Sequence, residues 1–217
     1  MSSAFGQYLK LSIFGQSHGE ALGVTLDGFP AGMTIDMEQL LAEMARRAPG
    51  QSLMTTARKE PDAPEFLSGV LNGRTTGQPI CAIIRNTNQR SKDYGDGVDL
   101  VRPGHADYTG HVRYFGFEDW RGGGSFSGRL TAGIVLAGAL CSQYLAHRGV
   151  KIACHIQQLG DVRDASFLTA DAAADYAYLK GMHLPVLTAG LNQQMEEAVL
   201  AARDKQDSVG GVLECMV

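Results

Sequence analysis

The first part of the chain alternates short apolar runs with glycine-rich loops. Residues 8–14 (YLKLSIF) and 21–27 (ALGVTLD) are rich in strand-forming residues, which predicts two β-strands. The segment GQSHGE between them has the composition of a tight loop. This loop presents Ser17 and His18.

A second pair of strands is predicted where EFLSGVLNGRTTGQPICAII surrounds a turn signal. β-Rich segments near residues 66–72 and 79–84 lie on either side of Asn72-Gly73 and Gly77. Asparagine followed by glycine is a strong signal for a hairpin turn. The pattern therefore predicts a hairpin or strand pair, and a polar segment follows over residues 85–125.

Helical periodicity appears in two further segments, with a different pattern in each. Asp36, with Gln39 three residues on, has the pattern of a helix N-cap. It precedes MEQLLAEMARR, in which apolar residues recur at helical spacing and two arginines close the helix. From Ser127 to Gly149 the sequence is apolar nearly all round, which predicts a buried helix.

The last third of the chain has mixed patterns. A strand is expected near residues 150–157 and a final strand over 212–217. Helices are expected between them, over residues 169–179 and 191–205. The final run reaches Val217 without a turn, cap or polar tail, whereas a chain terminus usually lies exposed at the surface. We therefore expect the protein to continue beyond this point.

Composition narrows the class of protein. Of 217 residues, 44% are hydrophobic and 19% charged, which is typical of a soluble globular protein. No repeat or linker is visible, so residues 1–217 are expected to form a single domain. The longest apolar run, Ala132–Cys141, is shorter than the about 20 residues of a membrane span, and the N-terminus lacks the apolar core of a signal peptide. We therefore expect a cytoplasmic protein that binds no membrane.

Charge is distributed unevenly along the chain. Residues 1–154 carry 15 basic and 14 acidic side chains, whereas residues 155–217 carry 4 basic and 9 acidic ones. The basic chemistry therefore lies in the first two thirds. The cysteines form no CxxC pair, so neither a zinc site nor a disulfide framework is expected, and we interpret them as reduced, mostly buried thiols. They are Cys81, Cys141, Cys154 and Cys215.

The loop GQSHG at residues 15–19 matches the nucleophile elbow G-x-S-x-G of serine hydrolases in letters. An elbow needs a helix directly after the turn, whereas the following ALGVTLDG is typical of a strand, so a hydrolase with Ser17 as nucleophile is disfavoured. His18 is the better candidate, because the flanking glycines leave its imidazole uncrowded and histidine transfers protons near neutral pH. The alternative is a histidine that merely hydrogen-bonds a turn.

A second histidine lies in the motif RPGHADY, within a rigid Pro-Gly turn. His105 is close in sequence to Arg102 and Asp107, and the carboxylate of Asp107 is a candidate to orient it or stabilise its charge. A metal site formed by His105 with His111 is disfavoured, because no third ligand has suitable spacing. Taken alone, this stretch is an unspecific candidate site.

The third candidate is RGGGSFSGR (residues 121–129), which runs directly into the predicted buried helix. Glycines with free N–H groups, two hydroxyls, a helix N-terminus and flanking arginines form a place where phosphate can bind. The motif is neither a Walker loop nor the dinucleotide fingerprint. A nucleic-acid interface is disfavoured by the negative net charge, so a small phosphorylated, carboxylated ligand fits better. Further basic residues in polar segments are Arg46, Arg47, Arg58, Lys59 and Arg113.

Seven motifs together give the chain a resemblance to the chorismate synthase family. They occur in the family's order and cover the chain from end to end, and RPGHADYT together with GGG-x-x-S-G-R is highly specific. The motifs are FGQSHG (14–19), RAPGQS (47–52), TTARKEPD (55–62), LSGVLNGRTTGQPI (67–80), NTNQRSKDY (86–94), RPGHADYT (102–109) and RGGGSFSGRLT (121–131).

The resemblance implies an α+β fold, a β-α-β sandwich of antiparallel sheets and helices that is incomplete at the C-terminus of this chain. It implies a lyase of the shikimate pathway to aromatic amino acids. This lyase converts 5-enolpyruvylshikimate 3-phosphate, a phosphorylated dicarboxylate, to chorismate and phosphate by anti-1,4-elimination. The implied enzyme is a homotetramer that requires reduced FMN, and some family members also reduce the flavin with NADPH.

The resemblance also implies roles for individual residues. His18 is the implied general acid toward the departing phosphate, and His105 the proton donor that keeps the reduced flavin suitably charged. Ser125, Phe126 and Ser127 match the stretch that contacts flavin. Arg47 matches a position of the substrate or nicotinamide-cofactor anion site. The arginines expected to bind substrate are Arg46, Arg47, Arg102 and Arg129.

The chain departs from the family's usual pattern in several places. The family has glutamate where Gln16 stands, a third arginine where Ala48 stands and an arginine where Leu53 stands, and its R-S-S-A-R-E-T reads SFSGRLT here. These departures resemble a subfamily variant, because the glycines, both histidines and Arg129 remain. After DSVGG the family continues with a segment that holds a flavin-phosphate loop and an aspartate thought to act in proton removal. The alternative function is therefore a truncated, non-catalytic remnant that binds anionic ligands or subunits without turnover.

Overall fold

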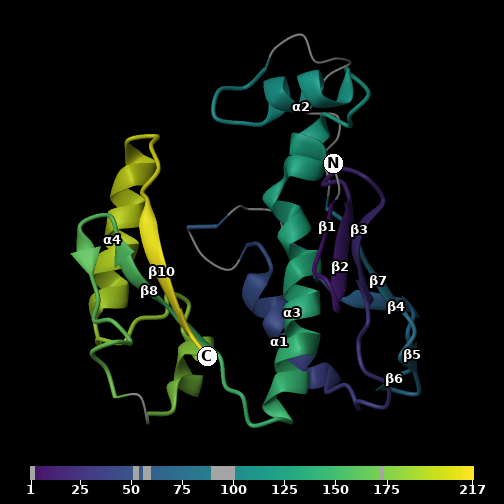
Figure 1. The fold of residues 1–217 in the computed structure, drawn as a ribbon. Helices are drawn as coiled ribbons and strands as arrows, with labels where there is room; N and C mark the ends of the chain where they lie inside the picture. Colours follow the sequence, from purple (N-terminus) through teal and green to yellow (C-terminus); the bar gives the residue numbers. More distant parts are fainter. Residues whose placement is uncertain (1–2, 51–53, 56–59, 89–100, 172–173) are drawn as a thin grey trace. The chain divides into compact units, whose positions relative to one another are not determined.

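The structure, a computed structural model, divides into two compact units (Figure 1). Unit 1 comprises Met1–Gln51 with Ala57–Tyr144, and unit 2 comprises Ser52–Thr56 with Leu145–Val217. Each unit has its own antiparallel sheet and its own cluster of buried apolar side chains. The residues that the structure describes are 3–50, 54–55, 60–88, 101–171 and 174–217.

Unit 1 is built on a five-stranded antiparallel sheet. In chain order its strands are β1 (Ala4–Phe5), β2 (Lys10–Gly15), β3 (Ala21–Asp27), β4 (Pro64–Ser68) and β7 (Ile80–Arg85). Their order in the sheet is β1-β2-β3-β7-β4. Buried and half-buried residues alternate along β7, as expected of a strand with one face in the core. The two predicted strands on either side of the His18 loop are thus confirmed as β2 and β3, which pair with each other.

The Asn72-Gly73 signal forms the predicted turn. β5 (Val70–Leu71) and β6 (Arg74–Thr75) pair across it. The φ angles of Asn72 and Gly73 are 49° and 72°, in the left-handed region that these two residue types tolerate best. The larger strand pair expected in this segment is also present, as β4 and β7.

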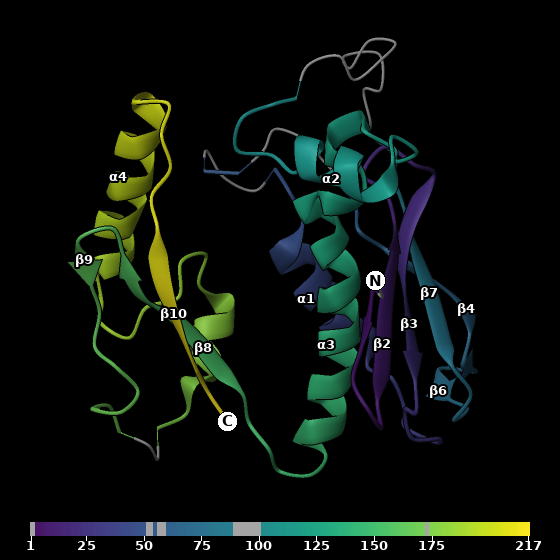
Figure 2. The same ribbon diagram turned by 45° about the horizontal axis from the view of Figure 1, so that its top comes forward.

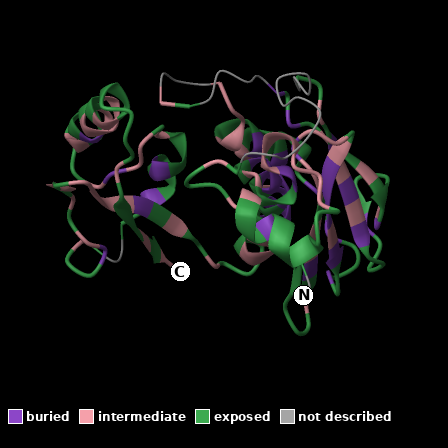
Figure 3. Ribbon diagram, turned by 90° about the horizontal axis from the view of Figure 1, so that it is seen from above, coloured by how far each residue is buried: buried purple, intermediate pink, exposed green. Residues whose placement is uncertain are grey.

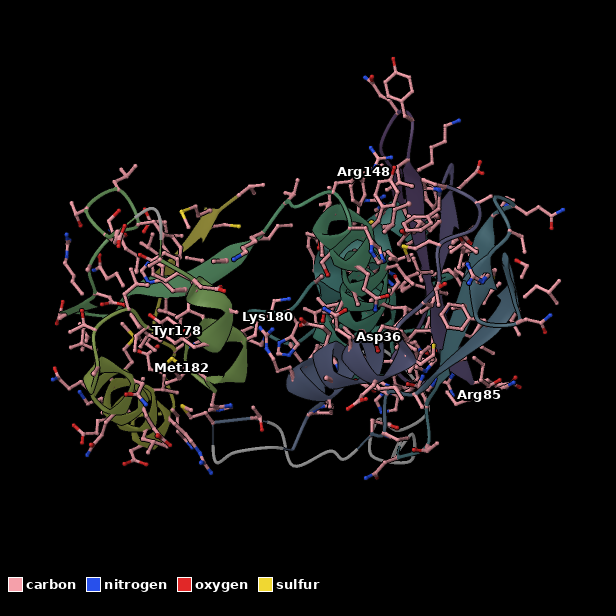
Figure 4. All side chains as sticks on the ribbon, turned by 90° about the horizontal axis from the view of Figure 1, so that it is seen from below. Asp36, Arg85, Arg148, Tyr178, Lys180 and Met182 are labelled. Carbon is pink, nitrogen blue, oxygen red and sulfur yellow. The ribbon has the colours of Figure 1, made fainter. Side chains whose placement is uncertain are left out.

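Two helices contribute to the core beside this sheet, as Figures 1 and 2 show. α1 (Met37–Arg47) begins after Asp36, whose carboxylate accepts a hydrogen bond from the amide of Gln39 at 2.9 Å, as predicted. α3 (Thr131–Ala146) is joined to the start of α1 by Gln143. The side-chain amide of Gln143 bonds both the backbone N–H (3.0 Å) and the carbonyl (2.8 Å) of Asp36, which is labelled in Figure 4.

The buried-helix prediction for α3 is confirmed for one face of the helix. Leu136 and Leu140 are buried in the core, whereas Ile134 is 45% exposed, and Figure 3 shows buried and exposed positions along the same helix. In the described part of the chain, one helical stretch, Gly128–Ala146, is long and apolar enough to cross a membrane by length and composition alone. The core helix of a soluble protein passes the same test, and half of this stretch is buried inside the fold.

The polar segment contains helical elements that the sequence does not predict. They are α2 (Asp107–Tyr114) and a 3-10 helix, η2 (Arg121–Phe126). A further 3-10 turn, η3 (Gly128–Leu130), directly precedes α3, within the segment predicted to be helical. Gly110 lies within α2, where glycine lowers helix propensity by about 1 kcal/mol relative to alanine. The position is close-packed, since a Cβ there would lie 2.8 Å from the ring of Phe126. Tertiary packing against η2 therefore outweighs the local preference.

Unit 2 contains a three-stranded antiparallel sheet with the order β10-β8-β9. Its strands are β8 (Ala153–Leu159), β9 (Val162–Arg163) and β10 (Gly211–Met216). The predicted strands near 150–157 and 212–217 are confirmed, and they pair with each other. The predicted helix over 191–205 is confirmed as α4 (Leu191–Asp204).

The predicted helix over residues 169–179 is wrong. In the described part of this segment stands a short 3-10 helix, η4 (Tyr176–Gly181), from which the labelled Tyr178 and Lys180 come in Figure 4. The carboxylate of Asp175 accepts a hydrogen bond from the amide of Ala177 at 3.1 Å and caps this turn. Aspartate favours caps over helix interiors, which explains why the alanine-rich run is interrupted. Residues 172–173 lie outside the described residues.

The expectation of mostly buried thiols is also wrong. All four cysteines are outside disulfides; Cys81 and Cys141 are half-buried, and Cys154 and Cys215 are exposed. The latter two face each other across β8 and β10, next to the buried His155. Because successive side chains of a strand point to opposite faces, they lie on the outer face of this sheet. Burial raises the pKa of the Cys141 thiol.

Candidate active site

His18 lies in the tight turn between β2 and β3. The amide of Gly19 donates to the carbonyl of Gln16 at 3.2 Å, which closes the turn. A strand, β3, follows the turn instead of a helix, and Ser17 is 1% exposed. The serine hydrolase interpretation is therefore wrong, because a nucleophile elbow requires an exposed serine at a strand-to-helix turn.

The hydroxyl of Ser17 fixes the ring of His18. Ser17 Oγ lies 3.0 Å from the carbonyl oxygen of Gly122, to which it donates, and 2.9 Å from Nδ1 of His18. A hydroxyl has one proton, so Oγ accepts a hydrogen bond from Nδ1–H. In this arrangement Nδ1 is the nitrogen of the His18 ring that Ser17 holds.

The glycine-rich loop η2 packs directly against this turn. The φ angles of Gly122, Gly123 and Gly124 are 61°, 86° and 52°, all left-handed. A Cβ on Gly122 would lie 2.0 Å from Nδ1 of His18, so no side chain fits there. The amide of Ser17 donates to the carbonyl of Gly124 at 3.1 Å. The structure thus brings together two motifs that are about a hundred residues apart in the sequence.

The three residues expected to contact flavin follow these glycines. Ser125 is exposed, Phe126 is 44% exposed, and the ring of Phe126 lies 6.1 Å from that of Tyr114. The hydroxyl of Ser127 accepts a hydrogen bond from the amide of Arg129 at 3.2 Å and caps η3. Ser125 and Phe126 therefore present surface for a ligand, whereas the hydroxyl of Ser127 already has a structural role.

Arg47 and Arg129 converge on one buried carboxylate. Asp62 is fully buried; its Oδ2 accepts from Nη1 of Arg47 at 2.8 Å, and its Oδ1 accepts from Nη1 of Arg129. Arg47 also donates from Nη2 to the carbonyl of Gly128 at 3.2 Å. Two guanidinium groups and one carboxylate give this cluster a net charge of +1. An anion is the ligand that such a buried excess of positive charge favours.

Arg129 carries the most direct sign of a binding site. Its side chain is 4% exposed, and its Nε donates to Oδ1 of Asn86 at 3.1 Å. Its Nη2 is buried and has no hydrogen-bond partner among the described residues. Leaving a buried charged donor without an acceptor is costly. A bound phosphate or carboxylate oxygen would supply the acceptor.

His105 lies in the turn before α2. Its Nδ1 is 3.2 Å from the carbonyl oxygen of Pro103. Asp107 instead receives three hydrogen bonds from Arg102, from Nε, Nη2 and the backbone N–H at 2.8, 2.9 and 3.0 Å. The hydrogen bond from the Arg102 side chain is the main reason why the pKa of Asp107 is lowered to about 2. The expectation that Asp107 orients His105 is therefore wrong, although its negative charge remains close to the ring.

The hydrogen bond between the His105 ring and Pro103 stays within its own turn and does not join the ring to the His18 turn. A hollow connects its motif with the glycine loop, because Asp107 and Gly110 of α2 line it together with Gly123 and Phe126. The RPGHADY and RGGGSFSGR motifs thus share one surface.

The remaining predicted side chains are placed as follows. Arg46 is exposed and pairs with Glu43 at 2.8 Å, outside the Asp62 cluster, so its substrate contact stays a prediction. His111 pairs with Glu118 at 3.2 Å. No three of the described His, Cys, Asp or Glu residues are grouped so that they could hold a metal ion. Arg58 and Lys59 lie outside the described residues.

Sequence reasoning missed Asp62 and Asn86 as site residues, although both stand in motifs singled out above. The signal for Asp62 was the charge balance, because clustered arginines that fold into a core need a buried counter-charge. Asn86 has no signal in the sequence, since an amide at a strand end is ordinary in loops.

Comparison with known proteins adds an independent observation. The family model for chorismate synthase matches residues 9–217. The chain is 43% identical to the chorismate synthase of Sulfurimonas denitrificans over 215 residues, covering 99% of this chain and 58% of the relative. It is 44% identical to that of a Sulfurovum species over 211 residues, covering 97% and 57%.

A solved structure agrees. The crystal structure of a chorismate synthase matches with a TM-score of 0.73 at 28% identity, covering 96% of this chain and 57% of that one. The expected α+β fold of antiparallel sheets and helices is thereby confirmed. The chain spans a little under three fifths of the length of the relatives just described.

Proposed function

The chain belongs to the chorismate synthase family, and on this premise we propose that it forms part of a lyase that converts 5-enolpyruvylshikimate 3-phosphate to chorismate and phosphate in the shikimate pathway. The observation that carries the proposal is the buried Nη2 of Arg129, which has no acceptor among the described residues. A substrate with a phosphate and two carboxylates offers the oxygen that this nitrogen lacks.

The two arginines divide the work of binding. Arg129 donates from Nη2 to the substrate, whereas Arg47 shares Asp62 with it and thereby holds the guanidinium groups in place. The cluster keeps its net positive charge, and its burial strengthens the attraction for an anion, because a low local dielectric screens charges less than water does.

His18 is the proposed general acid. With Nδ1–H directed to Ser17 Oγ, the protonated ring donates from Nε2 to the oxygen of the departing phosphate. Proton transfer by a positioned side chain typically contributes about 100- to 10,000-fold to a rate. The glycine at position 122 lets the loop approach the ring closely enough to keep this orientation.

The glycine-loop surface fits a flavin, because exposed Ser125 and Phe126 offer a hydroxyl and an aromatic face beside a backbone free of side chains. Reduced FMN, when bound, supplies electron density to the substrate ring while the C–O bond breaks. His105 is the proposed proton donor on this side. It donates from Nε2 when its ring is protonated, since Nδ1 lies against the carbonyl of Pro103.

The family resemblance supports three further proposals: a homotetramer, a cytoplasmic location, and NADPH as a reductant of the flavin. Light scattering on the purified protein tests the first. Anaerobic oxidation of NADPH in the presence of FMN tests the last.

An anaerobic assay with reduced FMN tests the elimination directly, by following chorismate absorbance and phosphate release with the protein at its native length. We expect turnover that falls at least 100-fold in His18→Gln and in Arg129→Lys. Arg85→Lys is the matched control, because Arg85 is exposed at the end of β7 and pairs with the exposed Glu65 (Figure 4). Full activity in both site variants would refute the assigned roles. Substrate binding without turnover would instead favour the non-catalytic alternative.

A further inference from the structure

Asn86 stands where the two halves of the candidate site meet. It directly follows β7, and its backbone N–H donates to the carbonyl of Glu20 at 3.0 Å, which fixes it beside the start of β3. Its side-chain Nδ2 donates to the carbonyls of Gln16 (3.0 Å) and Gly19 (2.9 Å). These two residues open and close the turn that contains His18.

The opposite end of the same amide holds the cationic half of the site. Oδ1 of Asn86 accepts the hydrogen bond from Nε of Arg129 at 3.1 Å. An amide is planar and has donors on one side and an acceptor on the other. A flipped amide would set its oxygen against two carbonyl oxygens and its NH₂ against a guanidinium N–H. The surroundings therefore allow one orientation, and the amide is a rigid link.

We propose that Asn86 is a positioning residue that couples anion binding at Arg129 to the placement of the His18 ring. An anion that engages Nη2 of Arg129 adjusts the guanidinium group, whose Nε is bound to the amide. The amide passes this adjustment to the carbonyls of Gln16 and Gly19, and so to the turn between them. The inference rests on the proposed function, which identifies the anion as substrate and His18 as the acid.

The coupling has a consequence that runs in both directions. Because linked binding equilibria are reciprocal, a change that displaces the His18 turn also changes the affinity of Arg129 for an anion. Asn86 thereby couples His18 to the anion site at Arg129, whereas without this link the two side chains would act independently.

The test uses inorganic phosphate as the probe and needs no turnover. The ring signals of the six histidines are followed by NMR during a phosphate titration, with the His18 signal identified by its loss in His18→Gln. Calorimetry on the same samples measures phosphate affinity. In the unchanged protein we expect phosphate to bind and to shift the His18 ring signal.

Asn86→Asp separates the two ends of the link. It keeps an oxygen for Arg129 but replaces the donor to the two carbonyls by a second oxygen. We expect phosphate to bind about tenfold more weakly, because the added charge neutralises the cluster, and the His18 signal at saturation to stay where it was without phosphate. Asn192→Asp is the charge-matched control, since Asn192 is exposed on α4, and it should respond as the unchanged protein does.

Arg129→Lys removes the hydrogen bond at the other end of the link, from Nε of Arg129 to Asn86. It provides the test if the Asn86 variant fails to fold. Lysine keeps the positive charge but lacks Nε, so we expect residual phosphate binding without a His18 response. Any of three results would overturn the proposal: no phosphate binding to the unchanged protein, no His18 shift in the unchanged protein, or an undiminished His18 shift in both variants. If the native-length protein makes no chorismate while the phosphate response is lost as described, the coupling stands and the proposed function falls.

Discussion

Each unit of the molecule buries a small cluster of charges, and the two clusters differ in what they leave unpaired. In unit 2, His155 is fully buried between two carboxylates, with Nδ1 3.2 Å from Asp164 and Nε2 2.9 Å from Glu214. Glu214 also accepts from Ser166 Oγ at 2.6 Å and from the amide of Phe167 at 2.8 Å. Both ring nitrogens thus face an acceptor, and the carboxylates face further donors.

The cluster of unit 1 has similar ingredients but is incomplete. Each carboxylate oxygen of Asp62 accepts a hydrogen bond from one arginine, yet Nη2 of Arg129 has no partner in the described part of the chain. A closed network holds strands together: His155 on β8 and Glu214 on β10 are direct neighbours across the sheet. An open network holds elements together and also keeps a donor for a ligand. Burial of charge alone therefore does not single out a candidate site, whereas an unmet hydrogen bond within the buried cluster points to Arg129 as a candidate ligand contact.

The largest effect is expected when the open cluster loses its only described carboxylate, Asp62. Asp62→Asn leaves two guanidinium groups facing each other without a buried counter-charge. Breaking a buried ion pair on one side typically costs about 3–5 kcal/mol. We expect the free energy of unfolding, measured by urea denaturation, to fall by that amount, and added phosphate to restore part of it. Glu65→Gln is the control, because its pair with Arg85 is exposed; a similar loss there would contradict the interpretation.

A smaller effect is expected at Gly122, the glycine that lets the loop η2 pack closely against His18. Gly122→Ala places a Cβ where 2.0 Å separates it from Nδ1 of His18, and its φ of 61° is unfavourable for alanine by about 1–2 kcal/mol. We expect a displaced His18 ring signal in NMR spectra and loss of the proposed elimination. Gly128→Ala is the matched control in the same segment, since nothing lies within 4 Å of a Cβ there. An unshifted His18 signal in Gly122→Ala would argue against the close packing described.

The closed cluster of His155, Asp164 and Glu214 should make the stability of unit 2 depend on pH. The hydrogen bond from Ser166, followed by that from His155, lowers the pKa of Glu214. A carboxyl with a lowered folded-state pKa stabilises the fold above its unfolded value of about 4.3 and loses that contribution as pH falls through the folded value. The hydrogen-exchange protection factors of the β8 and β10 amides should therefore fall below about pH 4. In Glu214→Gln this fall should be smaller, whereas Glu197→Gln, on the surface of α4, should retain it in full.

The smallest predicted effect concerns Asp107, which lines the hollow between α2 and the glycine-rich loop. With Arg102 as partner its pKa is about 2. In Arg102→Gln the pKa should rise toward the ordinary value of about 3.9, which carboxyl NMR titration measures directly. Arg121→Gln is the control, because Arg121 pairs with Asp119 at 2.8 Å. A rise in Asp107 of equal size in both variants would show that general charge, and not the specific hydrogen bonds, sets the value.

The elements that the sequence predicts well are those whose pattern is local. The cap of α1 at Asp36 and the turn at Asn72-Gly73 depend on residues within three positions, and both are confirmed. α2 was missed because its stability comes from packing of Gly110 against Phe126, which no local pattern records. The false helix over 169–179 has the opposite cause, since helix-favouring alanines concealed the capping preference of Asp175.

The candidate site divides in the same way. His18, Arg47 and Arg129 were found from motifs and from the residue types that phosphate chemistry needs. Asp62 and Asn86 were missed because their roles consist of contacts to residues far away in the sequence: Asp62 is 67 positions from Arg129, and Asn86 is 43 positions from it. The residue type alone indicates that a side chain can bind a ligand, whereas it does not indicate that a side chain positions a distant ligand-binding residue.

The long reach of these contacts has a consequence for how the chain matures. Ser17 finds its acceptor at Gly122, 105 positions later. Contacts between residues so far apart in sequence form late in folding, because the entropy cost of closing a long loop precedes the stabilisation that the contact provides. Synthesis proceeds from the N-terminus at about 5–20 residues per second. Several seconds therefore pass between synthesis of the His18 turn and synthesis of the Gly122 loop that packs against it. Until then the growing chain contains His18 and Arg47, but neither Arg129 nor the complete candidate site.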